Sequence, residues 1–221
     1  MKKLLSLFIC FTIITSVFAQ QNETSSTQDA VSLDLLDKMS NTYKNSTGTE
    51  IGLKIELEDG QSGTTNSIKG TLKTQGKNFV LETSLANMTF DGKYLWVYNK
   101  AANEITVSAP AVEDLEGIDP TSIMGSYKKG YTISAPEYKT ENGKEIAVIS
   151  LYPEDKEDPF FKSTISLDTK TYEPVGVSTH NKNGMISTIN ITKLKTNLNY
   201  KPNELDFDPT KYPKAMLIDL R

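Results

Sequence analysis

Short runs in which apolar residues alternate with polar ones are the feature that most limits how this chain can fold. Apolar residues occupy every second position from Ile51 to Leu57, with glycine, lysine and glutamate between them. Similar alternation recurs around 68–73, 105–107, 165–167, 175–177 and 189–191. Because successive side chains of a strand point to opposite faces, each run predicts a β-strand with one apolar face.

Four turn dipeptides separate these runs: Asp59-Gly60, Asp91-Gly92, Asn142-Gly143 and Asn183-Gly184. Such pairs tolerate the positive φ angles that tight hairpins need. A parallel sheet would require helical crossovers between most strands, and the pattern contains none. The sequence therefore predicts an antiparallel meander.

Two segments depart from this alternation. Near the start, apolar residues recur at helical spacing and predict an amphipathic helix with Ser26 or Thr27 as its N-cap and Gly48 just beyond its end. The members of this stripe are Val31, Leu35, Leu36, Met39 and Tyr43. Between Ala109 and Lys129 the alternation stops, and Asp119-Pro120 is typical of an N-cap followed by proline at the first helical position.

The second helical segment carries its own apolar stripe, formed by Ile123, Met124 and Tyr127, and Gly130 ends it. An apolar helical stripe needs a surface to cover, and the apolar face of the sheet is available. We therefore expect a mainly β (α+β) fold: a strongly curved antiparallel sheet with the N-terminal helix and a short helical lid over its concave apolar face.

The N-terminal residues have the character of a secretory signal peptide. Two lysines precede an apolar stretch, and Val17-Phe18-Ala19 is a small-residue cleavage pattern, which predicts cleavage after Ala19. We expect a signal peptide over 1–19, a flexible polar leader over 20–28 and a single domain over 29–221. The one cysteine, Cys10, falls inside the signal peptide, so the mature domain is expected to fold without disulfides.

Charge and motif content argue against several functions. Without Lys2 and Lys3 the chain has 22 basic and 28 acidic residues, and this net charge of −6 disfavours nucleic acid as a partner. His180 is the single histidine, which disfavours a zinc site. Ser126 and Lys129 fit Ser-x-x-Lys without its companion motifs, and the acidic loop at 154–158 lacks EF-hand spacing. A hydrolase is disfavoured because no nucleophile and base pair stands out, so we expect neither an enzyme nor a metal or cofactor.

One run is more specific than the rest. The segment from Phe90 to Asn99, Phe-Asp-Gly-Lys-Tyr-Leu-Trp-Val-Tyr-Asn, resembles the "DGK-x-LW-x-YN" strand of the outer-membrane lipoprotein carrier family, LolA. Other similarities follow in the same order: Gly70-Thr71-Leu72, the turn Gln75-Gly76-Lys77-Asn78, the strand Glu104-Ile105-Thr106-Val107, and then the helical insert. The C-terminal Tyr212-Pro213 and Ile218-Asp219-Leu220-Arg221 are similar to divergent members from Bacteroidetes-type bacteria.

The resemblance implies an incomplete β-barrel with a helical lid, located in the periplasm. It further implies a monomeric carrier that takes acylated lipoproteins from an inner-membrane ABC transporter to an outer-membrane acceptor. Lys77 stands where the family usually has a lid-holding arginine, so Lys77 is the candidate lid latch. The alternative function is a lipid-binding or envelope-stress sensor module on the same scaffold.

Under this hypothesis the acyl chains contact apolar residues of the sheet and the lid. The candidate residues are Leu53, Ile55, Leu57, Ile68, Leu72, Phe79, Leu81, Met88, Phe90, Trp96, Ile105, Val107, Ile123, Met124 and Tyr127. Two alternatives stay open at this stage. These residues could form an ordinary packed core, and Trp96 could face either the cavity or the outer surface.

Overall fold

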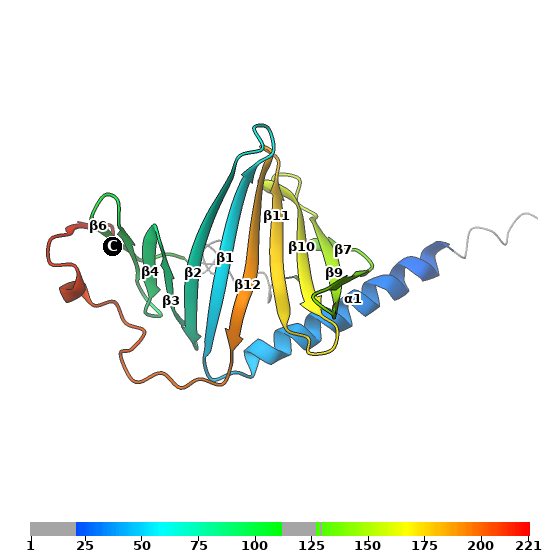
Figure 1. Ribbon diagram of the computed structural model, residues 1–221, viewed down its shortest axis with the longest axis horizontal. Helices are drawn as coiled ribbons and strands as arrows, with labels where there is room; N and C mark the ends of the chain where they lie inside the picture. The colour runs from blue at the N-terminus through cyan, green and yellow to red at the C-terminus, as the bar shows by residue number, and fades with distance from the viewer. Residues whose placement is uncertain (1–20, 112–126, 129) are drawn as a thin grey trace, which may run out of the picture.

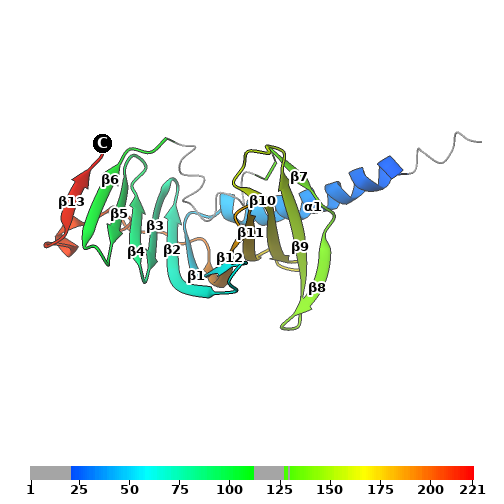
Figure 2. The ribbon, with the colours of Figure 1, turned by 90° about the horizontal axis from the view of Figure 1, so that it is seen from above.

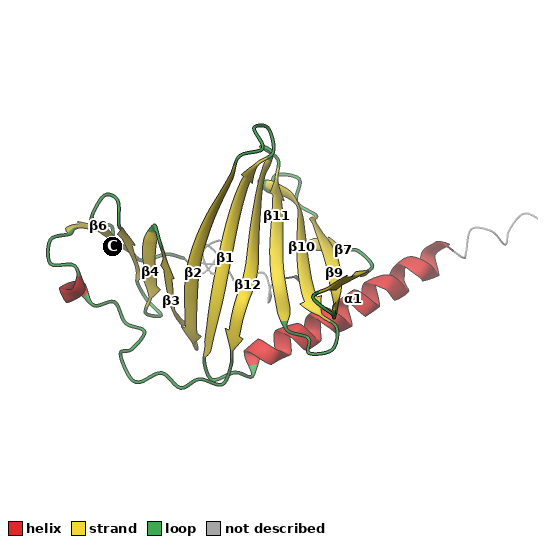
Figure 3. Cartoon of the chain, viewed as in Figure 1, coloured by secondary structure: helices red, strands yellow, loops and turns green. Residues whose placement is uncertain are grey.

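One long helix and one large, curved β-sheet make up the described chain, residues 21–111, 127–128 and 130–221, in this computed structural model (Figures 1 and 3). The helix, α1, spans Gln21–Lys44. The strands are β1 (Thr49–Asp59), β2 (Thr65–Gln75), β3 (Asn78–Thr83), β4 (Ala86–Phe90), β5 (Leu95–Asn99), β6 (Glu104–Ser108), β7 (Tyr131–Ile133), β8 (Glu137–Glu141), β9 (Lys144–Pro153), β10 (Phe160–Asp168), β11 (Pro174–Asn181), β12 (Met185–Lys195) and β13 (Met216–Asp219). A short 3₁₀ helix, η1, covers Pro209–Lys211.

The sheet is built outward from β1. Strands β2 to β6 follow one another on one side of β1, and β12, β11, β10 and β9 follow on the other. These pairings are antiparallel, whereas β13 pairs in parallel with β6 and forms one edge. Strands β7 and β8 both pair with β9 at the other edge. The sheet curves without closing (Figure 2), so the predicted mainly β fold with a strongly curved, incomplete barrel is confirmed.

The turn dipeptides explain the hairpins, with one difference. Asn142 and Gly143 adopt φ angles of 51° and 76° and join β8 to β9 in a two-residue turn. Gly92 and Gly184 also have positive φ, at 89° and 88°. Gly60 does not. The loop between β1 and β2 is longer than a two-residue turn, and its left-handed residue is Gly63, with a φ of 67°.

The start of α1 differs from the sequence expectation. The helix begins at Gln21, so Ser26 and Thr27 lie inside it and neither is its N-cap. The helix includes residues 21–28 of the segment that the sequence suggests is a polar leader, and the flexibility of that leader stays a prediction. Residues 21–28 include neither proline nor glycine, and extending an existing helix costs little free energy compared with starting one.

One position on the buried face of α1 differs from the predicted stripe. The other four members are buried or packed against the core, but Val31 is 42% exposed, whereas its neighbour Ser32 is fully buried. The Ser32 hydroxyl donates a hydrogen bond of 2.6 Å to the backbone carbonyl of Ser134, between β7 and β8. This hydrogen bond satisfies the hydroxyl and removes most of the cost of burying it.

After β12 the chain crosses the end of the sheet and reaches the outer face of β5 and β6 (Figure 1). The hydroxyl of Tyr200 donates to the carbonyl of Thr49 at 3.0 Å, and its backbone N–H donates to Gln75 Oε1 at 2.8 Å. The segment 205–221, which we call the C-terminal strap, then supplies η1 and β13.

Aromatic rings hold the strap to the sheet. The ring of Trp96 stacks on Phe207 with 4.7 Å between centroids and an interplanar angle of 4°. Tyr98 meets Tyr212 at 4.0 Å. The guanidinium of Arg221 lies 5.7 Å from the centre of the Trp96 ring. The C-terminal strap and β5 therefore form a small aromatic cluster on the outer face.

Replacing Phe207 with alanine should remove the stacking on Trp96. We expect the free energy of unfolding to fall by about 1–2 kcal/mol, from the lost ring pair and its burial. Trp96 is the single tryptophan of the sequence, so its fluorescence emission should move to longer wavelength in the folded protein. Tyr138→Ala, at a side chain that is 55% exposed, is the control and should leave emission unchanged. An unshifted spectrum for Phe207→Ala would contradict the stacking.

The tight turn before β5 depends on Asp91. Its Oδ1 accepts hydrogen bonds from the backbone N–H groups of Lys93 and Tyr94 at 2.9 and 2.7 Å, and its Oδ2 accepts from the Trp96 indole at 3.3 Å. Partial burial acts to raise the pKa of the Asp91 carboxyl, but these donors together hold the pKa below its ordinary value.

Because its pKa is lowered on folding, ionised Asp91 stabilises the protein above the ordinary carboxyl pKa of about 3.9. That stabilisation is lost as pH falls through the lowered value. Asp91→Ala should therefore reduce the free energy of unfolding by about 1 kcal/mol at pH 7. The difference between wild type and variant should shrink in urea titrations repeated at decreasing pH below about 4. A difference that stays constant with pH would show that the ionised carboxylate has no such role.

Candidate lipid-binding face

An apolar strip crosses the concave face of six neighbouring strands. Cross-strand register aligns one residue from each strand, so that each contacts the next directly: Ile149 (β9), Ile165 (β10), Val177 (β11), Ile189 (β12), Ile55 (β1) and Ile68 (β2). β-Branched side chains suit a pleated surface of this kind. The strip therefore makes the inside of the sheet continuously apolar from β9 to β2.

The outer face of the same strands is charged and its charges are paired. Glu56 accepts from Lys54 Nζ at 2.8 Å and from Asn190 Nδ2 at 2.9 Å. Glu50 meets Lys193 and Lys195 at 3.1 and 3.2 Å, and these ammonium groups hold the pKa of Glu50 below its ordinary value. This contrast fixes which face is inside, since turning the sheet over would bury the charges.

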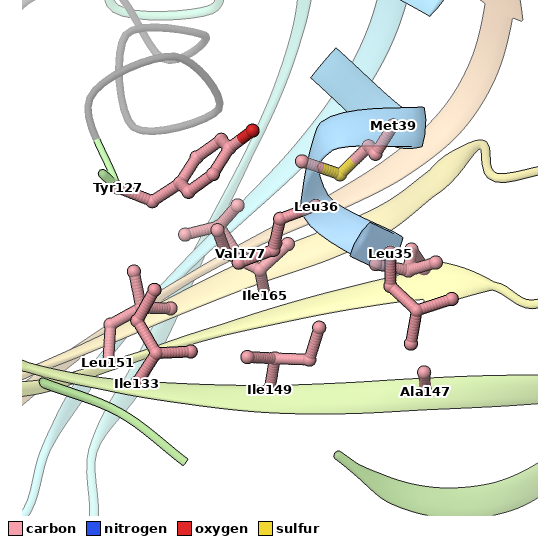
Figure 4. Close-up of a cluster of buried hydrophobic side chains, with 11 residues drawn as sticks. Leu35, Leu36, Met39, Tyr127, Ile133, Ala147, Ile149, Leu151, Ile165 and Val177 are labelled. Atoms are coloured by element: carbon pink, nitrogen blue, oxygen red, sulfur yellow. The ribbon is translucent and has the colours of Figure 1, made fainter. Parts of the chain in front are cut away.

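Helix α1 covers the part of the strip on β9, β10 and β11. Figure 4 shows Leu35, Leu36 and Met39 of α1 facing the side chains of Ile149 and Ile165. Leu36, Met39, Ile149 and Ile165 are fully buried. This half of the concave face is therefore a well-packed core.

Tyr127, in the part of the chain between β6 and β7, closes the same cluster. Its ring is fully buried (Figure 4), and its hydroxyl donates to Asp37 Oδ1 at 2.5 Å. Burial, and then the Asp37 carboxylate, raise the pKa of this hydroxyl. Lys128 Nζ also contacts Asp37, at 2.7 Å, so two consecutive residues attach this point of the chain to α1.

A second apolar cluster covers β1 to β5. Phe79 and Phe90 lie together in it with ring centroids 5.8 Å apart. Its buried members are Ile51, Leu53, Leu72, Phe79, Leu81, Phe90 and Leu95. Residues that border this cluster, among them Met88 and Val97, are only half-buried.

Between the two clusters runs what we call the apolar seam, formed by Tyr43, Ile55, Ile189 and Ile191. Tyr43 and Ile191 pack against both clusters, and all four side chains are half-buried. The strip thus changes along its length, from 0% exposure at Ile149 and Ile165 under α1 to partial exposure at Ile189 and Ile55. The seam is apolar surface that stays partly open.

The register places most of the predicted site residues on this concave face. They are Leu53, Ile55, Leu57, Ile68, Leu72, Phe79, Leu81, Met88 and Phe90. Tyr127 belongs to the cluster under α1. Ile123 and Met124 lie outside the described residues, as does the Ser126/Lys129 pair.

Three predicted site residues are on the other face. Trp96, Ile105 and Val107 point outward, because Leu95 and Val97 occupy the inner positions of β5 and Trp96 pairs directly with Val107. These three residues therefore lie off the concave face where the ligand is expected. For Trp96, the sequence leaves both faces open, and the structure places the ring on the outer surface. Ile105 and Val107 are buried on the outer side, next to β13 of the C-terminal strap.

Conversely, the predicted list omits the inner residues of β9 to β12. Ile165, Ile189 and Ile191 all belong to runs whose alternation predicts strands, and that alternation was the available signal. The alternation does not reveal the order of the strands in the sheet. Only the pairing of β1 with β12 brings Ile191 and Ile189 beside Leu53 and Ile55.

Lys77 is exposed in the two-residue turn between β2 and β3, where Gly76 has a φ of 61°. Most of the lid segment it was expected to hold lies outside the described residues, so a latch role stays a prediction. His180 is half-buried with its ring 5.9 Å from Phe161, and within the described ranges His, Cys, Asp and Glu side chains form no group of three that could hold a metal. In the same ranges, no helix combines the length and apolar character needed to cross a membrane.

A curved, open sheet with a charged outer face, an apolar inner face and one helix across it defines a β half-barrel with an apolar interior. The chain belongs to the outer membrane lipoprotein carrier protein LolA family, whose sequence profile matches residues 15–184. None of the curated protein sequences compared with this chain matches it.

Solved structures are similar to this chain at low sequence identity, and one with a TM-score above 0.5 shares its fold. An uncharacterized conserved protein from Thermus thermophilus is 10% identical with a TM-score of 0.57, covering 86% of this chain and 99% of that one. A putative outer membrane lipoprotein-sorting protein domain from Vibrio parahaemolyticus is 13% identical, with a TM-score of 0.45 and coverage of 79% and 95%. A LolA superfamily protein from Nitrosomonas europaea is 10% identical, with a TM-score of 0.44 and coverage of 80% and 98%.

The contrast between Leu36 and Val31 tests how α1 covers the sheet. Leu36→Ala opens a cavity in the cluster under α1 and should lower the free energy of unfolding by about 2–5 kcal/mol. Val31→Ala, on the exposed side of α1, should change it by less than about 0.5 kcal/mol. Urea denaturation followed by circular dichroism measures both. Equal effects of the two substitutions would contradict the orientation of the helix.

Proposed function

We propose that this protein is a periplasmic carrier that binds the acyl chains of lipoproteins against its concave face and moves them from the inner to the outer membrane. The observation that carries the proposal is the apolar strip, which is fully buried under α1 and only half-buried at the seam. Membership in the outer membrane lipoprotein carrier protein LolA family supports the same function.

The energetics of acyl chains explain why such a surface is useful. Withdrawing an acyl chain of about fifteen methylenes from water is worth roughly 12 kcal/mol, at about 0.8 kcal/mol per group. A carrier must cover that surface and also release it. A half-buried apolar seam beside a packed cluster suits both needs, because a chain can enter without unfolding the core under α1.

The proposed partners are acylated lipoproteins, an inner-membrane lipoprotein-releasing ABC transporter that loads the carrier, and an outer-membrane acceptor that unloads it. In this mechanism Lys77 contacts the lid as a compact charge, without the planar hydrogen-bonding fork of arginine. Opening of the lid would then require breaking contacts of Lys77 that are weaker and less directional than those of an arginine.

The direct experiment is expression of residues 20–221 in the periplasm of a Gram-negative host, followed by purification without detergent. Native mass spectrometry and lipid extraction then identify what is bound. We expect bound acylated lipoprotein or phospholipid. A clean unliganded mass, together with no uptake of a fluorescent fatty acid, would contradict the proposal. Lipid binding without transfer from the transporter would instead favour a lipid sensor.

A charge placed on the concave face should weaken this binding. Ile68 is half-buried at the β2 end of the strip, and its neighbour Lys69 is exposed on the outer face. Ile68→Glu should weaken acyl binding at least about tenfold, because a carboxylate would have to be desolvated or protonated. The control Lys69→Glu introduces the same group on the other face and should bind normally. Equal binding by both variants would place the ligand elsewhere.

A further inference from the structure

Tyr43 has a polar atom that its surroundings leave unused. Its hydroxyl is buried and finds no hydrogen-bond partner in the described part of the chain. Tyr43 belongs to the last turn of α1 and packs against both apolar clusters, as Ile191 does. A donor therefore sits within the otherwise apolar seam.

An unpaired buried hydroxyl is unfavourable, because the group loses its hydrogen bonds to water and gains none in return. Phenylalanine would pack the same ring without that penalty. Ile55, Ile189 and Ile191, which form the rest of the seam, have no side-chain acceptor to offer. Among the described residues none accepts from the hydroxyl, which leaves it able to donate to a molecule that enters the seam.

The charge that acts on this hydroxyl among the described residues is the carboxylate of Glu173. Burial, and then Glu173, raise the pKa of Tyr43, so the phenol stays protonated and remains a donor at physiological pH. A nearby negative charge disfavours an anionic acceptor such as a fatty-acid carboxylate. A neutral carbonyl is the acceptor that fits.

We propose that the seam recognises an acyl ester, with the Tyr43 hydroxyl donating a hydrogen bond to the ester carbonyl while the hydrocarbon lies along Ile55, Ile189 and Ile191. This inference rests on the proposed acyl-binding function and deepens it. According to this proposal, Tyr43 makes the protein prefer esterified chains over free fatty acids and over plain hydrocarbon.

The test compares methyl palmitate with hexadecyl methyl thioether, which lacks the carbonyl and whose sulfur is only a weak hydrogen-bond acceptor. Both are titrated as competitors of a fluorescent alkyl probe that has no carbonyl group. The wild-type protein should bind the ester about tenfold tighter than the thioether, as expected for one added hydrogen bond. Tyr43→Phe should lose this preference and bind the two equally, with its affinity for the thioether unchanged.

Two controls separate recognition from structure. Tyr98→Phe removes a hydroxyl on the outer face, where it donates to Asn103, and should keep the ester preference. The melting temperature of ligand-free Tyr43→Phe should be equal to or higher than that of the wild type, because an unpaired buried group is removed. A lowered melting temperature with equal loss of both ligands would assign the hydroxyl a structural role and overturn the proposal.

The outcomes also distinguish this inference from the proposed function. Wild-type protein that binds ester and thioether equally well would overturn the role of Tyr43 and leave acyl binding intact. Failure to bind either compound, or the alkyl probe, would overturn both. Palmitate binding as tightly as its methyl ester would contradict the selection against anions.

Discussion

Cross-strand register is the constraint on which the rest of this structure depends. From β9 to β2, each strand places a β-branched residue opposite the next, from Ile149 through Ile55 to Ile68. A slip of one residue in any pair would move the apolar side chains to the outside and turn the paired charges of Glu50 and Glu56 inward. The register of the strands from β9 to β2 is therefore strongly specified by the sequence.

Given this register, α1 determines how the concave face is used. By covering β9 to β11 with Leu36 and Met39, it converts half of the strip into a core that stabilises the fold. Since the helix ends at Lys44, near the boundary of the two clusters, the strip beyond it is less completely covered. The part of the concave face under α1 therefore stabilises the fold, while the adjacent seam stays partly exposed.

The sequence predicts the fold well and the candidate site only in part, for reasons that particular residues illustrate. Period-two alternation and turn dipeptides are local signals, and they correctly predict the strands and the curved meander. Which face Trp96 occupies depends on the parity of β5 relative to Leu95, and a run that is apolar on both faces hides that parity. Ser32 is buried while Val31 is exposed, and the hydrogen bond of Ser32 to Ser134 is a contact with a distant segment that local periodicity does not reveal. Ile189 comes beside Ile55 only through the long-range pairing of β12 with β1.

The pairing of β13 with β6 has a consequence for how the molecule assembles. Leu217 lies beside Ile105, and Ile55 beside Ile189, so contacts that complete the sheet join segments far apart in the sequence. Such non-local pairing must overcome a large loop-closure entropy before it is rewarded, and it slows folding. Until β12 and β13 have formed, one edge of β1 and one edge of β6 therefore have unpaired backbone N–H and C=O groups. During that interval the immature sheet is exposed to the wrong strands, and the speed of edge closure governs the yield of folded protein.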